Sequence, residues 1–184
     1  MDILISSNLE RLLYLLYNEN SNQVAELMKQ LKEKGRYEIS KEALAKLQEI
    51  FYGGSCDEAR TKATIANTFK KYHYLCDPHT AVAVHVYNQY RMKTHDKRTN
   101  VILSTASPYK FPETVLSSIA PGKTIKNEFV MLNHIEKITK MKIPQPLRHL
   151  NESKVLHCSR IEVKNMKRFI VKSLFQDCSK IEKS

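Results

Sequence analysis

The chain has 184 residues, of which 42% are hydrophobic and 27% are charged, with four glycines and six prolines. This composition is typical of a globular domain with a core and argues against a disordered or low-complexity protein. No run of 18 apolar residues occurs and the first residues lack a basic start, so the sequence predicts neither a membrane-spanning helix nor a signal peptide.

The four cysteines lie far apart and form no CxxC pair. This spacing favours reduced thiols in a cytoplasmic protein over disulfides or a metal site. The formal net charge is +11. A basic balance suits a nucleic-acid-binding module, but here Lys and Arg are spread along the chain and mixed with Glu. A lysine-rich soluble surface is therefore the favoured interpretation of the charge.

The chain begins with a short apolar run, Asp2–Ser6, which predicts a β-strand. Leucines at helical spacing then predict a helix over Leu9–Tyr17, which Ser7 and Glu10 would cap as a capping box. Residues 18–73 show no strand pattern and are interpreted as a helical insertion. Its predicted helices are Val24–Lys34, Lys41–Phe51 and a helix from the N-cap Asp57 to about Tyr72.

Asp77 followed by Pro78 predicts another helix start, since aspartate caps well and proline is tolerated in the first turn. The stretch Asn100–Pro112 begins with the apolar run Val101–Leu103, which predicts a buried strand. Hydroxyl side chains follow it directly. Ligands of open α/β sheets bind outside the carboxyl ends of strands, so this stretch is the first candidate for a site.

The remaining chain predicts mainly helices, with an extended segment at Ile143–Pro146 and a doubtful strand at Lys154–Cys158. The predicted helices are Glu113–Ile119, Asn127–Lys140 and Val163–Phe175, and residues 179–184 are expected to fray. Two good strands cannot form a parallel sheet with helices on both faces. The chain is therefore either mostly helical or the carboxyl-terminal part of a larger α/β domain, which would explain why residue 1 falls in a predicted strand.

The sequence contains no motif for metal, nucleotide or serine-hydrolase chemistry, since HExxH, GxxxxGK[ST], GxGxxG and GxSxG are all missing. Two polar loops remain, Ser104–Ser107 and Asp77–Thr80. Their hydroxyls could bind a heteroaromatic nitrogen or a carboxylate. From the residues alone, turn and capping chemistry is the favoured interpretation of both loops.

Three segments closely resemble bacterial and fungal threonine synthases, in that family's order: ILISSNLERLL at Ile3–Leu13, LCDPHTAVA at Leu75–Ala83 and VILSTASPYKFP at Val101–Pro112. The resemblance covers essentially the whole chain. It implies the carboxyl-terminal part of a pyridoxal-phosphate enzyme of the tryptophan-synthase-β fold type, an α/β fold rich in helices with a few parallel strands. Residues 1–17 and 74–184 would belong to the cofactor-binding domain. The implied reaction, a step of threonine biosynthesis, converts O-phosphohomoserine and water to threonine and phosphate.

The resemblance also implies which side chains form the site. Ser104 would meet the ring nitrogen of the cofactor, with Thr105 as the alternative, and Asp77, His79 and Thr80 would lie beside the cofactor. The expected substrate-binding residues are Ser6, Ser7, Asn8, Arg11 and Lys110. For both cations of that set, a structural salt bridge is an equally good interpretation.

The family's cofactor lysine and its phosphate-binding loop belong to an amino-terminal segment that this sequence does not contain. The SPYKF setting of Lys110 does not match the lysine motif of the family, so no catalytic residue is predicted in the chain. We therefore expect a fragment that is incomplete alone, with a separate amino-terminal chain as a possible partner. The alternatives are a regulatory protein built on a degenerate enzyme domain and a basic helical nucleic-acid-binding module.

Overall fold

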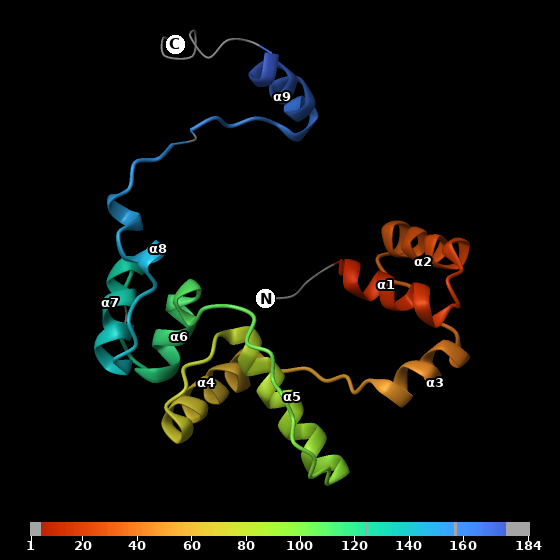
Figure 1. Cartoon of the computed structure of the whole chain (residues 1–184), viewed down its shortest axis with the longest axis horizontal. Helices are drawn as coiled ribbons and strands as arrows, with labels where there is room; N and C mark the ends of the chain where they lie inside the picture. Colours follow the sequence, from red (N-terminus) through yellow and green to blue (C-terminus); the bar gives the residue numbers. More distant parts are fainter. Residues whose placement is uncertain (1–4, 124, 157, 176–184) are drawn as a thin grey trace. The chain divides into compact units, whose positions relative to one another are not determined.

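The computed structural model of the chain describes residues 5–123, 125–156 and 158–175. Every regular element within these ranges is a helix, and no strand is present among them (Figure 1). Contacts divide the chain into two units, Met1–Ile143 and Pro144–Ser184.

The first three helices of unit 1 pack on one another. They are α1 (Ser7–Leu16), α2 (Ser21–Lys34) and α3 (Lys41–Ile50). Leu13 and Leu16 of α1 form a small buried core with Val24 and Leu27 of α2, and the partly buried Leu47 of α3 packs against it. The Tyr17 hydroxyl accepts the backbone N–H of Ser40 at 2.9 Å and ties the end of α1 to the start of α3.

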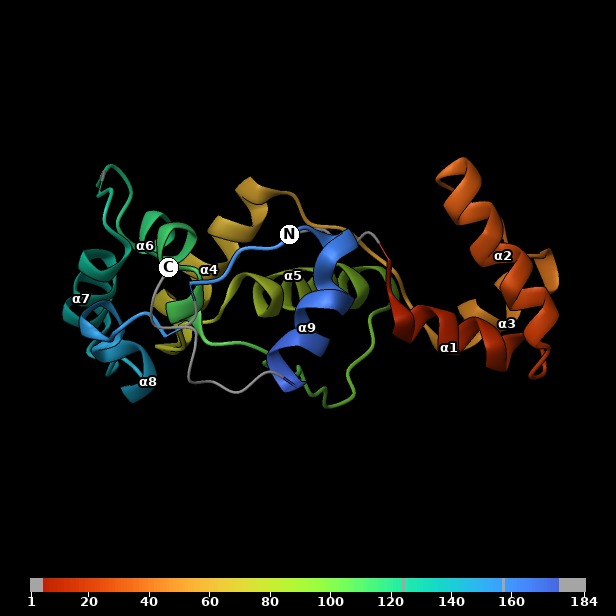
Figure 2. The same cartoon turned by 90° about the horizontal axis from the view of Figure 1, so that it is seen from above.

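The next four helices of unit 1 form a second packed group. They are α4 (Glu58–Tyr72), α5 (Pro78–Thr94), α6 (Pro112–Ile119) and α7 (Glu128–Thr139). Helix α4 packs against both α5 and α6, and α6 packs against α7 (Figure 2). Ile65, Val115 and Ile135 are completely buried between them. Because these side chains come from α4, α6 and α7, their burial fixes the frame on which α5 rests.

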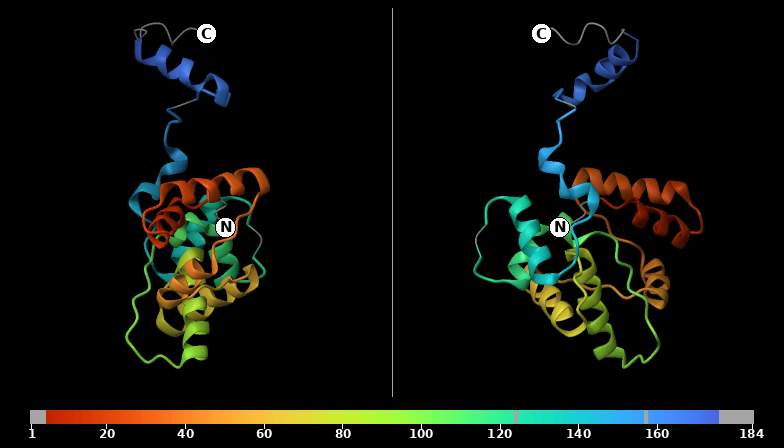
Figure 3. Two further views of the ribbon diagram at one scale, coloured as in Figure 1. Left: turned by 90° about the vertical axis from the view of Figure 1, so that its right-hand side faces the viewer. Right: turned by 60° about the vertical axis from the view of Figure 1, so that its left-hand side comes forward.

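The chain between α5 and α6 forms neither a helix nor a strand until the short 3-10 turn Pro108–Lys110 (Figure 3). The buried Tyr109 ends this segment, and its hydroxyl donates to the carbonyl of Met141 at 2.5 Å. That bond anchors the segment to the residues that follow α7.

Unit 2 contains helix α8 (Gln145–Arg148), two 3-10 turns and helix α9 (Met166–Phe175). The predicted helix over Val163–Phe175 is confirmed, with a 3-10 first turn at Val163–Asn165. The extended segment predicted at Ile143–Pro146 is partly wrong, because α8 begins at Gln145. Proline in the first turn of a helix costs no hydrogen bond, which is why Pro146 is compatible with α8.

The predicted helices of unit 1 are confirmed, with ends that coincide with the prediction or differ by up to three residues. The capping of α1 differs from the prediction, because Ser6 rather than Ser7 is the N-cap. The Ser6 hydroxyl accepts the backbone N–H of Leu9 at 3.3 Å, and Ser7 is already the first helical residue.

The predicted strands are not confirmed. The α/β fold class with a few parallel strands is therefore confirmed only in its richness in helices, since no parallel strand occurs in the described residues. Val101 and Leu103, expected in a buried strand, are 80% and 74% exposed. A strand needs a neighbour to pair its backbone, and none is present in this part of the chain. The described residues of Lys154–Cys158 form no strand either, and most of Asp2–Ser6 and all of residues 179–184 lie outside the described ranges.

Within the described ranges, no helix combines the length and the hydropathy needed to cross a bilayer.

Candidate functional site

Asp77 is a buried carboxylate of unit 1 whose two oxygens both accept hydrogen bonds. It precedes α5 as the N-cap, and its Oδ1 accepts the backbone N–H groups of His79 at 2.9 Å and Thr80 at 3.2 Å. Its Oδ2 accepts the Thr80 hydroxyl at 2.5 Å. The carboxylate is completely buried, so these donors replace the water that a charge would otherwise hold.

A chain of hydroxyls extends from Asp77 to the segment after α5. The Tyr74 hydroxyl donates to the Ser104 oxygen at 2.9 Å, and the Ser104 and Thr80 oxygens lie 3.4 Å apart. A hydroxyl has one proton to donate, and Thr80 donates its proton in the short hydrogen bond to the Asp77 carboxylate. Ser104 is therefore the donor in its contact with Thr80. Each hydroxyl thus donates a hydrogen bond to the next group, in the order Tyr74, Ser104, Thr80, Asp77. The Ser104 hydroxyl both accepts one hydrogen bond and donates one.

A cavity of about 670 Å³ opens beside this hydroxyl chain, between α4, α5 and the segment Ile102–Ser104. Its lining includes Tyr74, Thr80 and Ser104, and the sequence places the first and last of these 30 residues apart. The cavity has the size of a small-molecule site. The two polar loops singled out in the sequence, Asp77–Thr80 and Ser104–Ser107, thus both contribute to the lining of this cavity.

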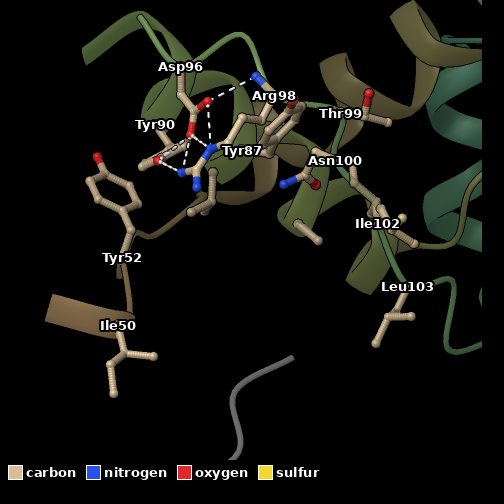
Figure 4. A pocket seen from close by; sticks show the side chains of 13 residues that line it. Ile50, Tyr52, Tyr87, Tyr90, Asp96, Arg98, Thr99, Asn100, Ile102 and Leu103 are labelled. Carbon is tan, nitrogen blue, oxygen red and sulfur yellow. Dashed lines mark hydrogen bonds and ion pairs between the residues drawn. The ribbon is translucent and has the colours of Figure 1, made fainter. Parts of the chain in front are cut away.

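A second cavity, of about 660 Å³, borders the same segment and is shown in Figure 4. Three of its lining residues form a compact cluster, in which the Asp96 carboxylate accepts a hydrogen bond from the Arg98 guanidinium at 2.6 Å and one from the Tyr90 hydroxyl at 2.8 Å. The hydrogen bonds from Arg98, and then that from Tyr90, hold the pKa of Asp96 below its ordinary value. Because Tyr90 belongs to α5, these bonds hold the residues just after α5 against that helix, where the chain continues to Ser104.

The segment that follows the loop borders both cavities. Ile102 and Ser104 line the 670 Å³ cavity, and Val101, Ile102 and Leu103 line the 660 Å³ cavity, with Val101 and Leu103 largely exposed. Thr105 is exposed and makes no hydrogen bond to any described residue. Its hydroxyl is free for an external partner, unlike that of Ser104.

The other predicted site residues are placed differently. His79 stacks edge-on against Phe111, with ring centroids 5.3 Å apart. Lys110 is exposed in the 3-10 turn. The four residues predicted near the start of the chain lie at α1, and none of them is among the residues that line either large cavity: Ser6, Ser7, Asn8 and Arg11. Ser6 caps the helix, and Arg11 donates to Asn8 at 3.4 Å.

Most side chains that line the 670 Å³ cavity were not predicted as site residues from the sequence, among them Lys71, Tyr74 and Arg91. A helical stripe would have indicated Arg91, because Thr80, Val84, Asn88 and Arg91 recur at spacings of four, four and three along α5 and all line the cavity. Tyr74 lies outside any helix, between α4 and α5, so no periodicity marks it.

The described residues contain no group of three or more His, Cys, Asp or Glu side chains arranged to hold a metal ion. Buried polar side-chain atoms in the same ranges all have hydrogen-bond partners.

Cys76, next to Asp77, is expected to be chemically inert. Its side chain is completely buried, and burial raises the pKa of the thiol to about 11, with the Asp77 charge acting in the same direction. At pH 8 almost no thiolate is present, so iodoacetamide should leave Cys76 unmodified in the folded chain while it modifies the exposed Cys158. Peptide mass spectrometry would locate the label, and urea should make Cys76 reactive. Equal labelling of both thiols without urea would contradict the burial of this site.

Residues 80–170 match the family model "Threonine synthase, C-terminal". The chain is 37% identical over 120 residues to a protein named "Threonine synthase-like 1" from Macaca fascicularis, an alignment that covers 65% of this chain and 16% of that protein. It is 36% identical over 115 residues to threonine synthase from Pseudomonas aeruginosa, with 62% of this chain and 24% of that enzyme covered.

The structural comparison agrees with the sequence comparison. A crystal structure of threonine synthase from Brucella melitensis with bound pyridoxal phosphate superimposes with a TM-score of 0.66 and 29% identity. The superposition covers 92% of this chain but 32% of that enzyme. The chain thus spans about a third or less of the relatives that it matches.

Proposed function

Because the chain carries the carboxyl-terminal portion of a threonine synthase, we propose that it supplies one wall of the active site of such an enzyme. The complete enzyme, a pyridoxal-phosphate-dependent lyase, would convert O-phosphohomoserine and water to threonine and phosphate in the cytoplasm. The observation that carries this proposal is the hydroxyl chain from Tyr74 to Asp77. It joins the two segments that most resemble the family, DPHTA and STASP, although they lie more than 20 residues apart.

Pyridoxal phosphate would supply the electron sink of the reaction, and this chain would orient its ring. The ring nitrogen needs a partner, and two hydroxyls are at hand. Ser104 already accepts from Tyr74 and donates towards Thr80, whereas the exposed Thr105 has no partner among the described residues. We therefore assign the ring nitrogen to Thr105, with Ser104 as the alternative. A neutral donor would leave that nitrogen largely unprotonated and so moderate the electron sink.

Asp77, Thr80 and Tyr74 would act by holding the segment at Ser104 in place. The carboxylate fixes the Thr80 hydroxyl, and the Tyr74 hydroxyl fixes Ser104. Thr105 is the next residue, so its position follows from these bonds. His79 and the α1 residues Ser6, Ser7, Asn8 and Arg11 stay predictions, and so does the division into residues 1–17, 18–73 and 74–184.

The rest of the enzyme would have to cover the exposed side of the same segment. Val101 and Leu103 present bare apolar side chains, and residues 100–106 form no backbone–backbone hydrogen bond with any described residue. Such an edge pairs readily with another strand. We propose that an amino-terminal portion of threonine synthase, in the same or a separate chain, pairs here and brings the lysine that binds the cofactor covalently.

Borohydride reduction with pyridoxal phosphate tests whether the lysine that binds the cofactor covalently lies outside this chain. For the present chain alone we expect no single lysine to be labelled stoichiometrically, because the exposed Lys110 lies in a surface turn and no other lysine is expected to bind the cofactor covalently. An amino-terminal fragment of the Pseudomonas aeruginosa enzyme, ending before the part that this chain matches, serves as the defined partner. Stoichiometric labelling of one lysine of this chain, with threonine production by it alone, would overturn the proposal.

A further inference from the structure

We infer that the 670 Å³ cavity between α4 and α5 binds a phosphate-bearing anion. The residues that line it include two cations, Lys71 and Arg91, together with His85, several hydroxyls and the amides of Asn67 and Asn88. None of the described residues in the lining is an aspartate or a glutamate. A concave site with cations and neutral donors but no carboxylate favours an anionic ligand.

The two cations are available for a ligand. Neither Lys71 nor Arg91 forms an ion pair with a described carboxylate. Each lies over a tyrosine ring instead: the Lys71 ammonium is 5.0 Å from the ring centroid of Tyr72, and the Arg91 guanidinium is 5.9 Å from that of Tyr87. Contact with an aromatic face holds a cation in place without neutralising it. Both side chains are exposed, and neither charge is neutralised by a described carboxylate.

The two helices aim their donors at the same space. On α5, Thr80, Asn88 and Arg91 lie on one helical stripe, and on α4 Thr64, Thr68 and Lys71 lie on another, at spacings of four and three. Two stripes that face one cavity from packed helices surround a ligand from two sides. Phosphate suits this arrangement, because its three terminal oxygens accept from several donors at once, and Arg91 can bind two of them together.

The source of the phosphate is decided by experiment. Inorganic phosphate, O-phosphohomoserine and pyridoxal phosphate share the group that Lys71 and Arg91 would bind. Pyridoxal phosphate serves as a comparison, because the resemblance assigns its phosphate to a loop of the amino-terminal segment. The inference rests on the proposed function only in the choice of the last two ligands. A chain that binds phosphate here but completes no threonine synthase would overturn the proposed function alone, and a chain that completes the enzyme but binds no phosphate here would overturn this inference alone.

Calorimetric titration of the folded chain with each of the three ligands tests the inference, at fixed ionic strength. Lys71→Gln and Arg91→Gln should each weaken binding by about 5- to 30-fold, the range for losing one charge-assisted contact. Lys70→Gln is the matched control, because Lys70 is exposed on α4 one residue away and does not line the cavity. It removes the same charge and should weaken binding less than about 2-fold.

Equal weakening by Lys70→Gln and Lys71→Gln would mean that the net charge of +11 attracts the anion diffusely, and this would overturn the inference. So would the absence of binding by the unsubstituted chain at millimolar ligand. Circular dichroism melting of each variant establishes that the fold is kept. The ligand with the largest difference between Lys70→Gln and Lys71→Gln identifies the source of the phosphate.

Discussion

Asp77→Ala is expected to lower the free energy of unfolding by about 3 kcal/mol. The substitution removes the N-cap of α5 and leaves the backbone N–H groups of His79 and Thr80 without an acceptor in a buried place. It also frees the Thr80 hydroxyl, which then no longer orients Ser104. Urea unfolding followed by circular dichroism measures the change.

Asp57→Ala is the matched control for this prediction. Asp57 caps α4 in the same way, accepting the backbone N–H of Arg60 at 2.8 Å, but its side chain is 57% exposed. Water can replace that acceptor, so we expect a loss of about 1 kcal/mol. Asp77→Asn keeps a capping oxygen and should fall between the two alanine variants. Equal losses for Asp57→Ala and Asp77→Ala would contradict the importance of burial at Asp77.

Thr105→Val should lower threonine formation by about 10- to 100-fold when the chain is combined with an amino-terminal threonine synthase fragment, the cost of one lost hydrogen bond in a dry site. Valine keeps the shape of threonine and removes only the hydroxyl. Thr105→Ser keeps the hydroxyl and should restore most of the activity. The absorbance of bound pyridoxal phosphate should shift in the valine variant, because the partner of the ring nitrogen has changed.

Ser104→Ala distinguishes the two candidate hydroxyls. In the proposed arrangement Ser104 is engaged by Tyr74 and Thr80, so its loss should lower stability more than it changes the cofactor spectrum. The opposite outcome, with a spectral change in Ser104→Ala and none in Thr105→Val, would assign the ring nitrogen to Ser104. The two single variants therefore decide between the interpretations that the sequence left open.

Local signals in the sequence predicted the helices well. Caps such as Asp57 and Asp77 act through neighbouring residues, and the structure has them where the sequence indicates. The strand at Val101–Leu103 was wrong for a physical reason. An apolar run favours burial in a sheet, but pairing needs a neighbouring strand, which no local pattern can supply.

The candidate site was only partly predictable. Ser104 and Thr80 were singled out as loop residues, and the structure brings them together. The bond that links Ser104 to Tyr74 spans 30 residues and depends on how α4 packs against α5, which neither capping nor periodicity encodes. The residues around Ser6 and Arg11 came from a family resemblance, and the hydrogen bonds found for them are local to α1.

The central claim is that this chain forms one wall of a threonine synthase whose cofactor lysine lies in an amino-terminal portion. Threonine release from O-phosphohomoserine tests it most directly, measured for the chain, for the Pseudomonas aeruginosa amino-terminal fragment and for their mixture with pyridoxal phosphate. We predict that the mixture alone forms threonine, and that it loses this activity with Asp77→Ala. Threonine formation by the chain without the fragment, or a mixture as inactive as its separate components, would contradict the claim.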